Sequence, residues 1–455
     1  MDQIFLERGK LNFLMDGNAG SSGKGKMASY IVKKEEVDYL VTSNSANASH
    51  TVVDNGIEYI FKALPSGSIY HEKLKAIFIA DNASFEVSAL LSEIEMVGIP
   101  REKVFISPRA GIIQQIDKDL EAGLCDIDGN YFKERQDGTI KTGTTASGSG
   151  SVLAKKVLRN KTLVTAKDIE EIKDMVSNVP ELIIDLHERG ATGLFEIGQG
   201  FPLSNNHPLF APHTTSRNVT VSSALNDAFL PPYLVGNLVL NFRALPIKIH
   251  NFKYIAKEEK NYFFDRQENE TDLELKMRVF KEHTLTNYYF SENGMYVDVK
   301  VGDQLSWFEK DDVEHDVIES YSGDFYPDQE EMTWDQLNES LGLEKNTIFE
   351  CTTLTKLPRR IASFSAMNVK EAIMYNNTGG RIFISVNFVN YVDPSCQGLK
   401  TEDIKTFAGL ESELPDTLNW LKNVVSPACE HTDVEISLIG TGASTDEVID
   451  LKRLS

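Results

Sequence analysis

The chain has 455 residues, more than a typical single core holds, so we expect either one large domain with additions or two domains. Hydrophobic residues make up 41% and charged residues 25%, as in ordinary globular proteins. The net charge of −22 argues against a broad nucleic-acid-binding surface and disfavours a membrane role. No run of 18 apolar residues occurs. We therefore expect neither nucleic acid nor membrane among the partners.

The cysteines and the first residues bear on the compartment. Cys125, Cys351, Cys396 and Cys429 lie far apart and have no metal-ligand spacing. Met1 leads into charged residues without an apolar signal segment. Together these features predict a reducing, cytoplasmic location.

Short apolar runs alternate with helix-like stretches along the chain. The runs occupy residues 11–15, 39–41, 75–80, 103–106, 193–196 and 381–386. This alternation predicts an α/β fold with a mostly parallel central sheet and flanking helices. The loops at the carboxyl ends of such strands are the expected functional site.

The composition changes between about residues 253 and 319, which hold 17 acidic and 9 basic residues. Alternating pieces such as Tyr296–Val301 occur within it. We interpret 253–319 as an inserted, acidic, small α+β subdomain, with 1–252 and 320–455 forming the catalytic domain. Pro246 and the turn at 320–323 mark its approximate edges. An ordinary part of the core with a solvated face is the alternative.

A glycine-rich segment, GNAGSSGKGK at residues 17–26, follows the first apolar run and precedes a helix-like stretch at 27–32. Its glycines allow successive backbone N–H groups to point at one anion, and Lys24 adds a positive charge. This context predicts a P-loop-like nucleotide-binding core. The Walker pattern itself fails, because Asn18 stands at its first glycine and Gly25 follows Lys24. A glycine-rich surface turn is the alternative.

Further segments carry groups suited to phosphate contacts or proton transfer. They are His50 within 47–51, the glycine- and hydroxyl-rich 143–150, Gln199 between two glycines, the hydroxyl-rich 213–220, and Lys356, Arg359 and Arg360 on a loop that contains Pro358. A basic cluster in so acidic a chain suggests a carboxylate or phosphate partner. Taken singly, each segment also fits a structural histidine, a linker or a polar loop.

In this order, the segments resemble the adenylosuccinate synthetase family. The family's Gly-Asp-Glu-Gly-Lys-Gly-Lys matches residues 20–26 apart from the two acids. Its Asn-Ala-Gly-His-Thr, Pro-Ser-Gly and Gly-Thr-Thr correspond to 47–51, 65–67 and 143–145. Gln199 falls on its Gly-Ala-Gln-Gly, and Arg359 falls in its aspartate-binding loop. The resemblance covers roughly residues 11–250 and 320–450 and implies a C–N bond-forming ligase.

The resemblance implies a reaction in two steps. A nucleoside triphosphate phosphorylates the purine 6-oxygen, and the amine of L-aspartate then displaces that phosphate. His50 is expected to act as the acid that stabilises the transferred phosphoryl group, and Lys24 to neutralise its charge. Ser21 lies at the family's catalytic aspartate, and Mg²⁺ is expected near Ser21 and the Ser49 carbonyl.

The resemblance also implies three sets of binding residues. The substrate nucleotide is expected to contact Asn47, Thr144, Thr145, Gln199, Thr215 and, from the partner subunit of a homodimer, Arg159. The aspartate is expected to contact Thr353, Thr355 and Arg359. The triphosphate is expected to contact Gly20, Ser22, Gly23, Lys24, Gly25, Lys26, Asn387, Asn390, Gly440 and Gly442.

The main departure from the family is Ser21, which replaces the aspartate that takes the proton from purine N1. Serine is too weak a base for that task. A serine beside N1 frees space for the 2-amino group of guanine and can accept a hydrogen bond from it. The phage branch of the family carries this replacement and acts on dGMP. What removes the N1 proton is left open, and a phosphate oxygen of the substrate is one candidate.

Two further departures concern the triphosphate and the sugar. Residues 387–390 read Asn-Phe-Val-Asn where the family reads guanine with Thr-Lys-x-Asp, so selection for GTP is expected to be lost. ATP or dATP becomes the expected donor. Leu357 aligns with the family's arginine that reaches a ribose hydroxyl, which suits a deoxyribose.

These features give three hypotheses. The first is a phage-type ligase that joins L-aspartate to dGMP with ATP or dATP, for the synthesis of 2-aminoadenine deoxynucleotide. The second is adenylosuccinate synthesis from IMP with an altered triphosphate preference. The third is a catalytically silent nucleotide-binding regulator.

Overall fold

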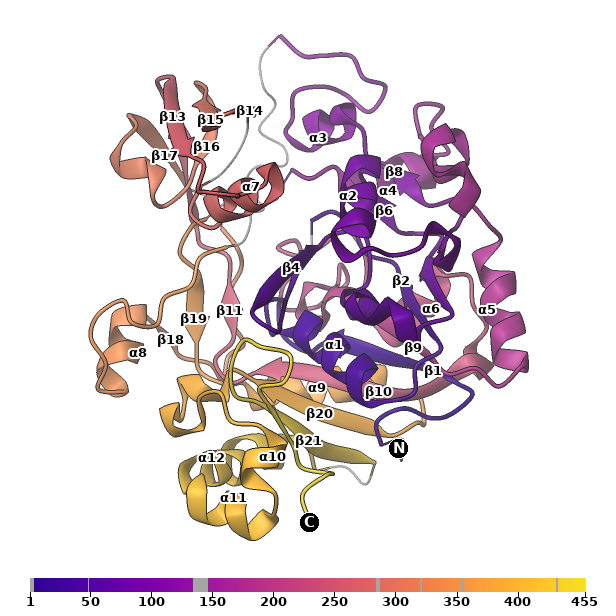
Figure 1. Cartoon of the computed structure of the whole chain (residues 1–455), viewed down its shortest axis with the longest axis vertical. Helices are drawn as coiled ribbons and strands as arrows, with labels where there is room; N and C mark the ends of the chain where they lie inside the picture. Colours follow the sequence, from indigo (N-terminus) through magenta and orange to yellow (C-terminus); the bar gives the residue numbers. More distant parts are fainter. Residues whose placement is uncertain are drawn as a thin grey trace.

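A nine-stranded sheet runs through the molecule (Figure 1). In spatial order its strands are β22 (Val448–Asp450), β21 (Val434–Gly440), β20 (Ile382–Asn387), β10 (Val235–Arg243), β1 (Leu11–Asp16), β9 (Gly193–Gly200), β2 (Tyr39–Thr42), β5 (Ala76–Ile79) and β7 (Val104–Ile106). All neighbours pair in parallel except β21 and β22. The prediction of an α/β fold with a mostly parallel central sheet is confirmed.

The computed structural model describes residues 4–47, 49–133, 146–283, 287–319, 321–352, 356–430 and 433–455. Its α-helices are α1 (Lys24–Lys34), α2 (Val87–Val97), α3 (Gln115–Glu121), α4 (Ser149–Leu158), α5 (Val179–Glu188), α6 (Val221–Asp227), α7 (Asp272–Phe280), α8 (Trp334–Ser340), α9 (Ala366–Asn376), α10 (Thr401–Ile404), α11 (Phe407–Glu413) and α12 (Pro415–Trp420). Within these ranges no helix is long and apolar enough to cross a membrane.

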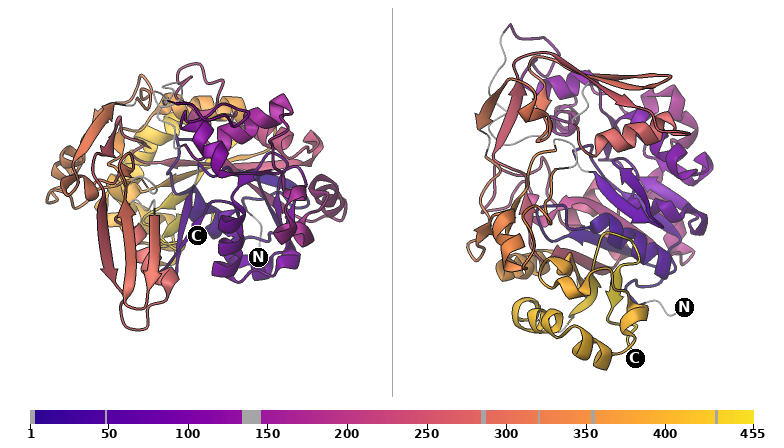
Figure 2. Two further views of the ribbon diagram at one scale, coloured as in Figure 1. Left: turned by 90° about the horizontal axis from the view of Figure 1, so that it is seen from above. Right: turned by 60° about the vertical axis from the view of Figure 1, so that its left-hand side comes forward.

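Helices cover both faces of the central sheet, which forms the middle of three layers (Figure 2). Successive side chains of a strand point to opposite faces, so Phe13 and Leu14 of β1 belong to different cores. Phe13 packs in the core covered by α5, α6 and α9, and Leu14 in the core covered by α1 and α2. Burial on both faces explains why the strands read as continuous apolar runs.

All six apolar runs singled out in the sequence are strands of this sheet. Strand β10, which lies between β1 and β20, was not expected. Its apolar pattern is broken by Asn237, Asn241 and Arg243, all of which are buried. These polar side chains have partners far away in the sequence, such as the carbonyl of Phe5 for the Asn237 amide, so the pattern alone does not identify them as interior.

Smaller sheets surround the central one. Two are pairs, β3 (His50–Asp54) with β4 (Ile57–Phe61), and β6 (Ser84–Phe85) with β8 (Gly111–Ile112). A third joins β11 (Ile247–Lys248), β19 (Arg360–Ala362) and β18 (Glu331–Met332) in antiparallel order. This third sheet lies between the central sheet and residues 252–319 (Figure 1).

The described residues of 252–319 form two antiparallel three-stranded sheets, and none of these strands joins the central sheet. One sheet consists of β16 (Gln304–Leu305), β12 (Phe252–Ala256) and β17 (His315–Glu319), and the other of β13 (Lys260–Asp265), β15 (Gly294–Val299) and β14 (Asn287–Ser291). Helix α7 packs on β15 through Leu275 and Val279. We propose that these elements are the inserted α+β subdomain expected at 253–319.

Candidate functional site

The glycine-rich loop connects the end of β1 at Asp16 with the start of α1 at Lys24. Its backbone is left-handed at Gly20, Ser21 and Gly23, with φ of 96°, 51° and 79°. The loop lies directly on strand β9, because a Cβ on Gly200 would lie 1.7 Å from the carbonyl oxygen of Asn18. The glycine at position 200 is therefore what allows the close approach.

Polar groups at the carboxyl ends of β10 and β20 hold the loop from beneath. The Nδ2 of Asn241 donates to the carbonyl of Ser22 at 3.0 Å, and the Nδ2 of Asn387 donates to the same carbonyl at 2.9 Å. The Nη1 of Arg243 donates to the carbonyl of Ser21 at 2.9 Å. The Arg243 guanidinium is also paired with Glu350. These contacts hold the backbone of the loop in place through the carbonyls of Ser21 and Ser22.

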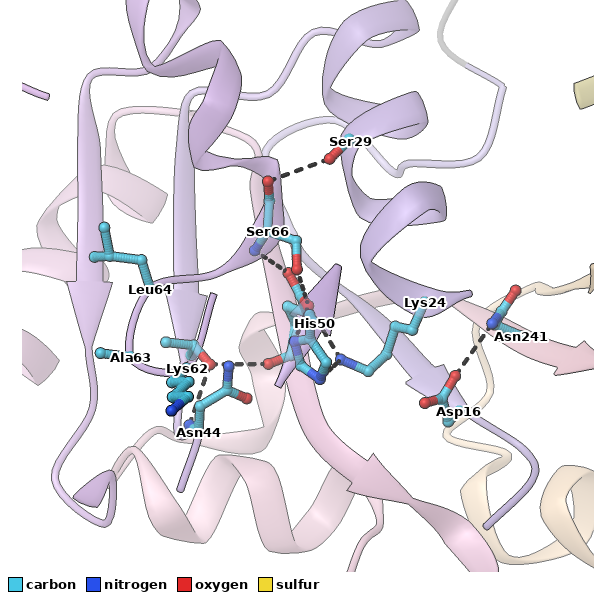
Figure 3. A network of polar contacts seen from close by, with 12 residues as sticks. Asp16, Lys24, Ser29, Asn44, His50, Lys62, Ala63, Leu64, Ser66 and Asn241 are labelled. Carbon is cyan, nitrogen blue, oxygen red and sulfur yellow. Dashed lines mark hydrogen bonds and ion pairs between the residues drawn. The ribbon is translucent and has the colours of Figure 1, made fainter. Parts of the chain in front are cut away.

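A buried charge cluster lies beside the loop (Figure 3). The ammonium group of Lys24 is 3.0 Å from Oε1 of Glu196 and 3.0 Å from Nε2 of His50. The other ring nitrogen of His50 lies 2.9 Å from the same carboxylate oxygen. Ser66 donates to Glu196 through its backbone N–H at 2.6 Å and its hydroxyl at 2.9 Å. Glu196 thus joins α1, β3 and the segment at Ser66.

The surroundings of Glu196 keep it ionised. Burial alone would raise the pKa of its carboxyl, but the charge of Lys24 and the hydrogen bonds from His50 and Lys24 outweigh burial and hold the pKa well below its usual range. A permanent negative charge at this point orients both Lys24 and His50. These are the two residues expected to act on the transferred phosphoryl group.

A cavity of about 680 Å³ opens in front of the loop, a size suited to nucleotide ligands. It is lined by eight of the residues expected from the sequence: Gly20, Ser21, Asn47, Ser49, His50, Gln199, Thr215 and Arg359. Three of them are linked, since Gln199 donates to Asn47 at 3.0 Å and Asn47 donates to Thr215 at 3.3 Å. The structure therefore brings together residues from four separate parts of the chain.

Two cationic side chains, Lys248 and Arg359, line the far wall of the cavity beside the neutral ring of His250, at or beside strands β11 and β19. Burial lowers the pKa of Lys248 to about 8 and the pKa of His250 to about 4. Burial also lowers the pKa of Arg359. In a chain of net charge −22, this concentration of cations suits an anionic ligand.

Other expected residues lie elsewhere. Lys26 is buried and donates to the carbonyls of Gly442 and Glu447, both at 2.7 Å, so it ties α1 to the loop after β21. A Cβ on Gly440 would overlap the buried amide of Asn387, and the Asn390 amide donates to Gln397. Lys26, Asn390, Gly440 and Gly442 are therefore not among the residues that line the cavity.

The remaining expected residues lie within the loop and the start of α1, outside the cavity, or outside the described residues. A Cβ on Gly25 would lie 3.0 Å from the Ser66 hydroxyl, and Ser22 donates its hydroxyl to Asp16. Arg159 ends α4 in a left-handed conformation, with φ of 53°, and is exposed outside the cavity. Thr144, Thr145, Thr353 and Thr355 lie outside the described residues.

Sequence reasoning missed four residues that shape the site: Asp16, Glu196, Asn241 and Arg243. Glu196 stood within the segment 195–200, where only the amide of Gln199 was selected. Asp16 immediately precedes the glycine-rich loop. Both residues could have been recognised as site residues, because each is charged and lies at or near the end of a buried parallel strand, where ligand sites form.

The site offers oxygen ligands for a cation. The described residues contain no group of three or more His, Cys, Asp and Glu side chains placed to hold a metal ion. Ser21 and Ser49, the two residues expected near the metal ion, nevertheless line one cavity. Magnesium bound to nucleotide phosphates needs only one or two protein oxygens, so the residues present fit it.

Comparisons with known proteins point to one family. The sequence model of the adenylosuccinate synthetase family matches residues 17–168, so this part of the chain is similar to that family. The family resemblance expected from the sequence is confirmed.

Individual relatives extend the match beyond that domain. The chain is 26% identical over 395 residues to N6-succino-2-amino-2'-deoxyadenylate synthase of Vibrio phage phiVC8, covering 84% of this chain and 87% of that enzyme. It is 32% identical over 239 residues to adenylosuccinate synthetase of Methanocaldococcus jannaschii, covering 52% of this chain and 65% of that enzyme.

A solved structure shares the fold. Succinoaminodeoxyadenylate synthetase of cyanophage S-2L, bound to dGMP and to dATP as an energy donor, superposes with a TM-score of 0.63. The two chains are 23% identical, and the match covers 97% of this chain and 95% of that one. The common fold therefore extends over nearly the whole chain.

The first prediction concerns the charge that orients Lys24 and His50. Glu196→Gln should destabilise the protein by about 3–5 kcal/mol at pH 7, because it leaves the buried Lys24 ammonium without its counter-charge. The midpoint of urea unfolding measures this. Since the folded-state pKa of Glu196 is depressed, the stabilisation is present above about pH 4.3 and is lost as the pH falls further.

Glu93→Gln is the matched control. The buried Glu93 carboxylate accepts hydrogen bonds from the backbone N–H groups of 62–64 and has no ion-pair partner among the described residues. Burial raises the pKa of Glu93 to about 7, so this carboxyl is partly protonated at neutral pH and an amide here removes less charge than an amide at Glu196. Equal destabilisation by both substitutions would contradict the role given to Glu196.

Proposed function

We propose that the protein is a ligase that joins L-aspartate to dGMP, driven by hydrolysis of ATP or dATP. The product is the succino derivative of 2-amino-deoxyadenylate, a precursor of 2-aminoadenine deoxynucleotide. The observation that carries the proposal is Ser21, which lines the cavity where the family has its catalytic aspartate. Relatives named for this product match most of the chain, and a protein of the same fold binds dGMP and dATP.

The loop and its neighbours would carry the phosphoryl transfer. Backbone N–H groups of the loop and the start of α1 form a cradle for the triphosphate. Lys24 and His50, both held by Glu196, stand at one end of that cradle. Lys24 neutralises charge on the phosphoryl group, and His50 donates a hydrogen bond to it as its bond to the leaving phosphate breaks.

The cavity would hold the two molecules that are joined. Asn47, Thr144, Thr145, Gln199 and Thr215 are assigned to the dGMP nucleotide, and the hydrogen bonds among Asn47, Gln199 and Thr215 hold those three side chains in place. Thr353, Thr355 and Arg359 are assigned to L-aspartate. The positive charges of Lys248 and Arg359 favour the anionic ligands.

The donor triphosphate is assigned an adenine base. Asn390 donates its amide to Gln397, and no described residue donates to its buried Oδ1. An amide oxygen accepts from the 6-amino group of adenine, whereas guanine offers an acceptor at that position. This arrangement favours ATP or dATP over GTP.

Mg²⁺ and a second subunit complete the proposal. When bound, Mg²⁺ would neutralise phosphate charge beside Ser21 and Ser49. Arg159 would reach the nucleotide of the partner subunit in a homodimer, and it follows Val157 and Leu158, which are 71% and 63% exposed. The expected location is the cytoplasm of a host cell.

The test of the function is a matrix of substrates. The protein is incubated with Mg²⁺, L-aspartate and each pairing of dGMP, GMP or IMP with ATP, dATP or GTP, and phosphate release and product mass are followed. Turnover should require L-aspartate and be fastest with dGMP and an adenine triphosphate. Turnover with IMP but not dGMP would support adenylosuccinate synthesis instead, and no turnover in any pairing would support a silent regulator.

A substitution at Ser21 tests how the purine is selected. Ser21→Asp puts a larger, charged side chain beside the proposed 2-amino group, and aspartate tolerates the left-handed backbone at this position. The ratio of kcat/KM for dGMP to kcat/KM for IMP should fall by about 10–100-fold. IMP serves as the internal control, because it lacks the 2-amino group. An unchanged ratio would contradict the assignment of Ser21.

A further inference from the structure

The proposed reaction leaves one proton without an acceptor. When the 6-oxygen of dGMP attacks the γ-phosphorus, the proton on N1 must depart. The Ser21 hydroxyl is too weak a base to take it. This inference rests on the proposed function and asks which group of the chain removes that proton.

Only two acidic side chains line the described part of the cavity, Asp16 and Glu121. Glu121 accepts hydrogen bonds from the backbone N–H groups of Gly148 and Gly150, at 2.8 and 2.5 Å, and so is engaged at the start of α4. Asp16 ends β1 and lines the same cavity as Ser21 and His50. Asp16 is therefore the cavity carboxylate that directly precedes the loop in which the family has its catalytic acid.

The contacts of Asp16 orient its carboxylate. The Ser22 hydroxyl and the Asn241 amide both donate to Oδ1, the latter at 3.1 Å (Figure 3). Asn241 is itself fixed, because Asn387 donates to its Oδ1 at 2.7 Å. Among the described residues no hydrogen bond reaches Oδ2 of Asp16. One oxygen is thus anchored and the other is available to a proton donor.

We propose that Asp16 is the catalytic base of the first step. Its Oδ2 takes the N1 proton of dGMP while the 6-oxygen forms a bond to the γ-phosphorus and the bond from that phosphorus to the β,γ-bridging oxygen breaks. The electron pair of the N1–H bond passes into the purine ring, and the bridging oxygen leaves with ADP or dADP. The protonated Asp16 returns its proton to solvent when the products leave.

The environment of Asp16 suits this task. Burial raises the pKa of its carboxyl, and the charge of Lys24, the hydrogen bonds from Ser22 and Asn241, and the charge of His50 offset part of that rise. A carboxylate with a raised pKa is a stronger base than an exposed one. In this proposal the base lies at the end of β1, whereas the family has it in the loop. The space beside Ser21 is then free for the guanine 2-amino group.

The test uses Asp16→Asn in the full chain. Positional isotope exchange in ATP labelled with ¹⁸O at the β,γ bridge, with dGMP and Mg²⁺ and without L-aspartate, reports the first step alone. Asp16→Asn should slow this exchange and kcat by about 100-fold or more. The Kd of dGMP, measured by calorimetry, should change by less than about threefold, because asparagine keeps the shape and can accept the same two hydrogen bonds.

The pH dependence separates a base from a structural residue. The wild-type kcat should fall as the pH drops through the raised pKa of Asp16, and this acidic limb should be absent in Asp16→Asn. Glu93→Gln, which changes a buried carboxyl outside the cavity, is the control and should keep both the exchange rate and the limb.

Three results would overturn the assignment. In the first, Asp16→Asn exchanges the isotope at a rate near that of the wild type. In the second, Asp16→Asn loses affinity for dGMP by the same factor as it loses rate. In the third, a higher Mg²⁺ concentration restores the rate of Asp16→Asn, which would make Asp16 a metal ligand. In each case the wild type still turns over dGMP, so the proposed function stands. Failure of the wild type to turn over dGMP would instead remove the function itself.

Discussion

The site depends on one buried ion pair, between Lys24 and Glu196. Both side chains are almost completely buried, and the carboxylate is supported there by two hydrogen bonds from Ser66 and by the His50 ring 2.9 Å away. Lys24 begins α1, and Glu196 lies in the neighbouring strand β9. The pair therefore fixes the start of the helix against the sheet, and with it the loop that precedes the helix.

The parallel sheet supplies the rest of the arrangement. The carboxyl ends of β1, β9, β10 and β20 meet at one edge and bring Asp16, Asn241, Arg243 and Asn387 beneath the loop. Glu196, Asn241, Arg243 and Asn387 act on the ligand through other residues, because they hold the loop, Lys24 and His50 in place. A site of this kind can change its substrate at an exposed position such as Ser21 while its supporting residues stay the same.

The strands and the loop could be predicted from the sequence, since buried parallel strands read as apolar runs and the loop has its own composition. His50, Gln199 and Arg359 could also be assigned, through the family resemblance. Glu196 and Asn241 could not, because their partners lie 172 and 225 residues away and only the order of the strands brings them together. Asn387 was expected to contact the triphosphate, and the structure places its amide under the loop, where it contacts Ser22 and Asn241.

The central claim is that the protein phosphorylates the 6-oxygen of a purine and then replaces that oxygen with aspartate. The most direct measurement follows ¹⁸O from dGMP labelled at the 6-oxygen, with ATP, L-aspartate and Mg²⁺ in unlabelled water. The account predicts that the label appears in the released phosphate, one atom for each molecule of product. Phosphate without the label, formed while product accumulates, would contradict it.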